Sequence, residues 1–124
     1  MKEDFFAELV TCEKGHENFT IGFSDNGDAP DSYIVLEKSL EFDEQDIDLG
    51  MDTYYFEFNG TSDYGVCKKV IFKKTSILFL LHDYFMDDIS EIMVSFLENS
   101  INNKREFVEI LQSILGDILE LDNE

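Results

Sequence analysis

The sequence predicts an α+β fold: an antiparallel β-sheet of about six or seven strands with a C-terminal helix packed on one face. Most of the chain alternates apolar and polar residues with the period of two that is typical of strands. The last quarter instead repeats apolar residues at helical spacing. The chain has 124 residues, 44% of them hydrophobic, and no linker rich in proline or serine. We therefore expect residues 1–124 to form one domain.

Two hairpins are predicted from strand-like runs on either side of polar turns. The first joins residues 5–12 to residues 19–24 through the turn CEKGHEN, and a third strand follows at 33–40. The second hairpin joins residues 68–74 to residues 76–82. The last of these strands is apolar on both faces, so we expect it in the centre of the sheet.

A fourth strand, at residues 53–58, is rich in aromatic residues. Alternation along a strand sends Tyr55 and Glu57 to one face and three aromatic side chains to the other. The three aromatic residues that we expect in the core are Tyr54, Phe56 and Phe58.

The C-terminal part combines a short helix, a strand and a long helix. Residues 83–100 fit either a helix or a strand, and we favour a short helix at 83–88 followed by a strand at about 91–97. Asn103, with Glu106 three residues later, is a typical helix N-cap, and Gly116 marks the predicted end of the long helix. Its apolar positions are Phe107, Ile110, Leu111, Ile114 and Ile118.

The charge balance restricts the class of partner. The chain has 28 acidic and 9 basic residues, which gives a formal net charge of −19. Nucleic acids and anionic membrane surfaces are polyanions, so the sequence disfavours both as partners. A basic protein or a cation is compatible, and electrostatic attraction would speed association with a basic protein.

The N-terminus and the cysteines indicate a compartment. The start MKEDFFAELV carries acidic residues where a signal peptide needs basic ones, and no apolar run is long enough to cross a bilayer. Cys12 and Cys67 are too few for a disulfide framework. We therefore expect a protein of the reducing cytoplasm with both thiols free.

Carboxylates are crowded into Glu41–Asp52, directly before the aromatic strand. The segment fails the spacing of a calcium loop, and neither histidine has a partner at metal-ligand spacing. Motifs of nucleophilic or nucleotide-dependent enzymes are absent from the sequence. The sequence therefore predicts a protein that is not an enzyme, with no catalytic residues, metal ligands or cofactor. A calcium- or small-ligand-binding α+β domain without catalytic activity remains the alternative.

Four of the nine basic residues are clustered in the second predicted hairpin: Lys68, Lys69, Lys73 and Lys74. Lysines on an exposed edge strand discourage pairing with other strands, which is the interpretation that we favour. A match for the acidic segment, within the chain or across a dimer interface, is the other interpretation.

Four stretches of the sequence together resemble a known family. The run from Glu41 to Glu57 resembles the central motif of immunity protein family ten of the bacterial polymorphic-toxin systems. Residues 21–25 resemble its glycine–aromatic–Asp strand end, residues 30–36 its Pro-x-x-Tyr strand, and residues 62–65 its Ser-x-Tyr-Gly turn. The resemblance covers about residues 5–72.

The resemblance implies a cytoplasmic antidote that binds and neutralises a cognate secreted toxin domain without catalysis or cofactor. We expect a basic toxin, and a nuclease is one such toxin because nucleases carry basic grooves. The acidic segment is either the binding surface or a structural turn, and a monomer and a homodimer are both open. The expected partner-binding residues are Glu41, Asp43, Glu44, Asp46, Asp48, Asp52 and Tyr55.

Overall fold

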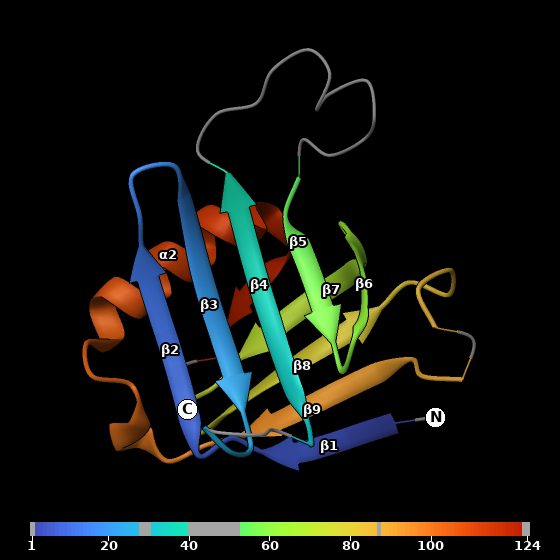
Figure 1. Cartoon of the computed structure of the whole chain (residues 1–124), viewed down its shortest axis with the longest axis horizontal. Helices are drawn as coiled ribbons and strands as arrows, with labels where there is room; N and C mark the ends of the chain where they lie inside the picture. Colours follow the sequence, from blue (N-terminus) through green and yellow to red (C-terminus); the bar gives the residue numbers. More distant parts are fainter. Residues whose placement is uncertain (1, 28–30, 40–52, 87, 123–124) are drawn as a thin grey trace.

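The computed structural model of the chain describes residues 2–27, 31–39, 53–86 and 88–122. Within these residues the chain forms ten strands in two five-stranded sheets, together with one 12-residue α-helix (Figure 1). The predicted α+β class and the C-terminal helix are confirmed. The prediction of one sheet with six or seven strands is wrong, because the strands divide into two layers.

The first sheet has the order β2-β3-β4-β5-β6, and each strand is antiparallel to its neighbours. The sheet is a meander in which consecutive strands are adjacent. A two-residue turn at Asn59 and Gly60 joins the last two strands, and both residues have the positive φ that such a tight hairpin requires (48° and 91°). The strands are β2 (Leu9–Lys14), β3 (Asn18–Ser24), β4 (Tyr33–Ser39), β5 (Tyr55–Phe58) and β6 (Thr61–Tyr64).

The second sheet has the order β1-β9-β8-β7-β10. Its three middle strands are antiparallel, whereas β1 and β10 join the edges in parallel to β9 and β7. Strands from near the two ends of the chain therefore form opposite edges of one sheet. The strands are β1 (Lys2–Phe6), β7 (Cys67–Phe72), β8 (Ser76–Leu81), β9 (Glu91–Ser95) and β10 (Leu119–Leu121).

The helix α2 (Lys104–Leu115) begins and ends as the sequence predicts. The side chain of Asn103 accepts a hydrogen bond from the backbone N–H of Glu106 at 3.1 Å, which satisfies one of the free donors of the first turn. Gly116 follows the helix with φ 62°. Single turns of 3₁₀ helix lie on either side, η1 (Glu98–Ser100) before α2 and η2 (Gly116–Ile118) after it.

The core lies between the two sheets, whose strands cross steeply in Figure 1, and α2 packs against β2, β3, β4 and β10. Phe23 is at the junction of the three layers. Its ring centroid lies 6.2 Å from those of Phe79 and Phe96 beside one sheet and 6.2 Å from that of Phe107 on the helix. The aromatic residues expected in the core are buried: Tyr54, Phe56 and Phe58.

Several predicted elements are confirmed with shifted limits. The first hairpin is formed by β2 and β3, but residues 5 and 6, which are predicted to lie in it, belong to β1 in the other sheet. The hairpin of β7 and β8 is present, with β8 at the centre of its sheet as expected. The strand expected at 91–97 is β9. The short helix expected at 83–88 is wrong, because residues 83–85 form a turn.

The lysines of the second hairpin do not protect an edge. Strand β7 is paired on both sides, with β8 and β10, so the interpretation as an edge strand is wrong. Three of the hairpin lysines instead contact carboxylates from later in the chain. These ion pairs are Lys69–Glu120 (2.9 Å), Lys73–Asp122 (3.7 Å) and Lys74–Glu98 (3.5 Å).

Both cysteine thiols are free, as the sequence predicts. Cys12 is exposed, whereas Cys67 lies in the core beside Tyr54, whose hydroxyl oxygen accepts a hydrogen bond from the Cys67 backbone N–H at 2.8 Å. Burial raises the pKa of the Cys67 thiol to about 12, so this thiol is unreactive at neutral pH. None of the helices in the described residues is both long and apolar enough to span a bilayer.

Candidate protein-binding face

The predicted binding residues fall into two groups. Tyr55 is described and lies at the start of β5. The six predicted carboxylates lie between β4 and β5, outside the described residues: Glu41, Asp43, Glu44, Asp46, Asp48 and Asp52. The described strands that flank this segment in the chain are β4 and β5, and their outward side chains form one face with those of β6.

Three tyrosines and one glutamate gather on this outer face. Antiparallel pairing places Tyr55 opposite Tyr64 of β6, and their ring centroids lie 5.7 Å apart. The carboxylate of Glu57 accepts one hydrogen bond from the hydroxyl of Tyr33 and another from the hydroxyl of Tyr55 (2.5 Å). We call Tyr33, Tyr55, Glu57 and Tyr64 the tyrosine–glutamate cluster.

Hydrogen bonds to Glu57 change the proton affinities in the cluster. Two phenol donors stabilise the charged carboxylate, and they lower the pKa of Glu57, with Tyr33 the larger contributor. The same bonds raise the pKa of Tyr33 and of Tyr55, because a phenol that donates to a carboxylate resists losing its proton. At neutral pH the cluster therefore carries one negative charge held between two neutral phenols.

Replacing Glu57 with glutamine should move the ionisation of Tyr33 and Tyr55 to lower pH. Because the pKa of Glu57 is lower in the folded protein than in the unfolded chain, its charged form stabilises the fold above the usual pKa of a glutamate. This stabilisation is lost as the pH falls and the carboxylate becomes protonated. Because the pKa values of Tyr33 and Tyr55 are raised in the folded protein, their neutral phenols stabilise the fold below about pH 10. This stabilisation is lost as the pH rises and the phenols ionise. The stability difference between wild type and Glu57→Gln should thus be greatest between about pH 5 and pH 10.

Tyrosinate absorbance in a pH titration measures this effect. Glu37→Gln is the matched control, since Glu37 lies on the same face but accepts its hydrogen bond from Asn18 rather than from a phenol. Identical tyrosine titrations in wild type and Glu57→Gln would disprove the coupling.

Sequence reasoning identified only part of the cluster. Alternation along β5 placed Tyr55 and Glu57 on one face, and the structure confirms this. Tyr33 and Tyr64 were missed as site residues, because they come from β4 and β6 and meet Tyr55 only through strand pairing. Both follow turn-like stretches, and the hairpin signal of Asn59-Gly60 could have aligned Tyr64 with Tyr55.

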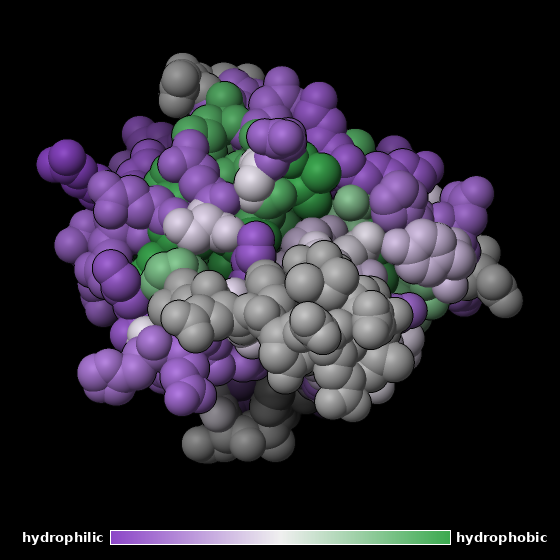
Figure 2. Space-filling model, turned by 90° about the horizontal axis from the view of Figure 1, so that it is seen from above, coloured by the Kyte–Doolittle hydropathy of each residue, from purple (hydrophilic) through white to green (hydrophobic). Residues whose placement is uncertain are grey.

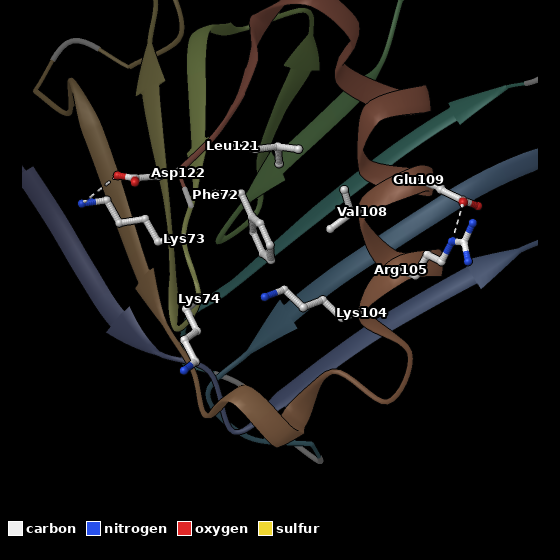
Figure 3. Close-up of a pocket in the computed structure, with 9 residues that line it drawn as sticks. All are labelled: Phe72, Lys73, Lys74, Lys104, Arg105, Val108, Glu109, Leu121 and Asp122. Carbon is white, nitrogen blue, oxygen red and sulfur yellow. Dashed lines mark ion pairs between the residues drawn. The ribbon is translucent and has the colours of Figure 1, made fainter. Parts of the chain in front are cut away.

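A groove of about 730 Å³ separates α2 from the ends of β7 and β10 (Figure 3). Phe72, Val108 and Leu121 supply its apolar side chains. The rim carries both signs of charge, and Lys73 and Arg105 pair with Asp122 and Glu109. The remaining lysines of its lining are Lys74 and Lys104. The groove offers apolar contact and mixed charge but no nucleophile with an activating base among its lining residues.

The face of the molecule seen in Figure 2 is mainly hydrophilic. Figure 2 shows charged and polar side chains over most of the coloured surface, with apolar side chains visible between them. Within residues 2–27, 31–39, 53–86 and 88–122, His, Cys, Asp and Glu side chains nowhere form a group of three or more that could hold a metal ion. The acidic segment lies outside these ranges, and a calcium- or small-ligand-binding domain stays the alternative.

Tyrosine is enriched at protein–protein interfaces, so three tyrosines on one sheet face are compatible with a protein-binding surface. Residues 7–102 match the family model described as Immunity protein 10, and the chain belongs to this family. This match confirms the resemblance of the sequence to immunity protein family ten. Membership makes this chain an immunity protein, whose partner is a cognate toxin. No curated protein matches the sequence.

Proposed function

We propose that this chain neutralises its cognate toxin in the cytoplasm by covering a basic surface of the toxin domain. The acidic segment supplies charge, and the tyrosine–glutamate cluster supplies rigid contact area beside it. The observation that carries the proposal is the position of Tyr55. It lies on the outward face of β5, three residues after the last carboxylate of the acidic segment, within the part of the chain that matches the immunity family.

Charge supports a basic partner. A net charge of −19 repels polyanions and attracts cationic surfaces over the Debye length of about 8–10 Å. Closely spaced carboxylates can replace the phosphates that a basic groove binds. A nuclease is therefore the toxin class that we propose, because its groove is built to receive repeated negative charges.

The tyrosine–glutamate cluster also supports a toxin-binding surface here, because its side chains are already held in place before binding. Glu57 holds the hydroxyls of Tyr33 and Tyr55, and the ring of Tyr64 packs against that of Tyr55. Tyrosines held in this way lose little conformational freedom on binding, and tyrosine is enriched among the residues that dominate binding energy. Once the toxin excludes water, Tyr55 acts as an anchor at the edge of the acidic segment.

Tyr55→Ala tests this proposal with the cognate toxin domain. We expect the dissociation constant to rise by about 10- to 30-fold, which corresponds to roughly 1.4–2 kcal/mol, and protection of cells that express the toxin to weaken. Titration calorimetry measures the first effect, and growth on co-expression measures the second.

Tyr84→Ala is the matched control, because Tyr84 is 63% exposed and lies in a turn outside the cluster. The control should bind like the wild type. If Tyr55→Ala, with its fold intact, binds the toxin as tightly as the wild type, Tyr55 is not part of the interface.

A further inference from the structure

The sheet formed by β1, β9, β8, β7 and β10 has an apolar outer face. Its inner positions fill the core, but several outward positions are also large and apolar. Strand pairing aligns Ile71, Leu78 and Met93 in one row across β7, β8 and β9, and Leu80 is next along β8. Phe6, at the corner on β1, is 47% exposed. We call these five residues the outer apolar face.

The described chain provides no layer over this face. The other sheet and α2 pack on the inner side, and α2 contacts β2, β3, β4 and β10. Antiparallel sheets with one face in water normally alternate apolar and polar residues, and β8 departs from this rule because its sequence is SILFLL. Ile71, Leu78, Leu80 and Met93 are only half-buried. Contiguous apolar surface of this kind is typical of an interaction site.

Charge identifies the class of partner. Most of the charged side chains near the apolar residues form two ion pairs. Lys2 contacts Glu91 at 3.1 Å and Lys69 contacts Glu120 at 2.9 Å, which leaves Asp4 of β1 and the exposed Lys68 of β7, whose charges are opposite. In a chain of net charge −19, this face is therefore almost neutral.

We propose that the outer apolar face is the interface between two copies of this chain. A basic toxin is attracted to the carboxylate-rich parts of the surface, whereas a second copy with the same net charge can approach closely only where the charge is small. A twofold axis through Leu78 would set the same row of apolar residues against itself. Two sheet faces packed in this way lie about 10 Å apart.

The area of the outer apolar face limits the expected affinity of the dimer. Its main strands have five or six residues and lie about 4.8 Å apart, so the face measures only a few hundred Å². A standard interface buries about 800 Å² on each partner. We therefore expect a reversible dimer with a dissociation constant in the micromolar range or weaker.

Sedimentation velocity over a concentration series, at low and high salt, tests the interface. We expect the dimer fraction to rise with concentration and with salt, because salt screens the repulsion between two acidic copies. Leu78→Glu should weaken the dimer by at least tenfold. Val35→Glu is the matched control, since Val35 is a half-buried apolar residue on the outer face of β4 in the other sheet, and it should leave the dimer unchanged.

Met93→Lys is a second interface variant, used if circular dichroism shows that Leu78→Glu does not fold. A wild-type protein that stays monomeric at millimolar concentration and high salt would overturn the proposal. A dimer that survives both Leu78→Glu and Met93→Lys in folded protein would do so as well. Neither outcome affects the proposed toxin binding, which involves the other sheet and weakens rather than strengthens with salt.

Discussion

Phe23→Ala should lower the free energy of unfolding by about 3–5 kcal/mol. The side chain is 1% exposed and contacts aromatic rings from the second sheet and from α2, so its removal leaves a cavity where three layers meet. Phe107 and Phe79 are themselves packed against other rings and cannot move to fill the space. A loss of this size is a large fraction of the 5–15 kcal/mol of a typical domain.

Urea unfolding followed by circular dichroism measures the loss. Phe6→Ala is the matched control, because Phe6 is 47% exposed; at protein concentrations where the chain is monomeric it should cost less than about 1 kcal/mol. Equal destabilisation by the two variants would contradict the assignment of Phe23 to the junction of the layers.

The pattern of the sequence determined the type of most elements but not their assembly. Residues 5–12 alternate like one strand, yet Ala7 is fully buried between β1 and β2, which belong to different sheets. The pairing that separates them joins β1 to β9, about 90 residues later, and no local pattern encodes it. Alternation shows which side of a strand is apolar and does not show which layer covers it.

The end of the chain illustrates a competition between local pattern and pairing. Apolar residues continue at helical spacing to Leu121, but Gly116 ends α2, and Leu119–Leu121 instead pair with β7. Backbone hydrogen bonds to β7 and the ion pair between Lys69 and Glu120 favour the strand. Such tertiary contacts override weak helix propensity.

The candidate site was predictable only in part, because some of its residues are brought together by strand pairing rather than by local pattern. Tyr55 and Glu57 are neighbours on one strand, so alternation places them together. Tyr33 is 24 residues before Glu57 in the chain, and only the register between β4 and β5 brings its hydroxyl to that carboxylate. The charge of the acidic segment could be read directly from the sequence, because charge does not depend on pairing.

Reversing Asp43, Asp46 and Asp48 to lysine should weaken toxin binding by about 10- to 1,000-fold at low salt, mainly through a slower association rate. The three changes raise the net charge by six, from −19 to −13. Because they replace attraction by repulsion at the proposed contact, the effect should shrink as salt screens it. Surface plasmon resonance at several salt concentrations separates the association and dissociation rates.

A control with the same net charge separates local from global electrostatics. Glu8, Glu17 and Asp88 are exposed and form no ion pair within the described residues. Their reversal to lysine also gives −13, and it should slow association much less. Equal effects of the two triple variants would assign the attraction to net charge alone and would remove the acidic segment as a specific site.

The most direct measurement is the activity of the cognate toxin domain, titrated with the wild-type chain at low and high salt. Neutralisation by an acidic surface predicts stoichiometric loss of toxin activity at low salt and weaker inhibition at high salt. A toxin that stays fully active while the chain is bound, or that forms no complex with it, would contradict the proposed mechanism.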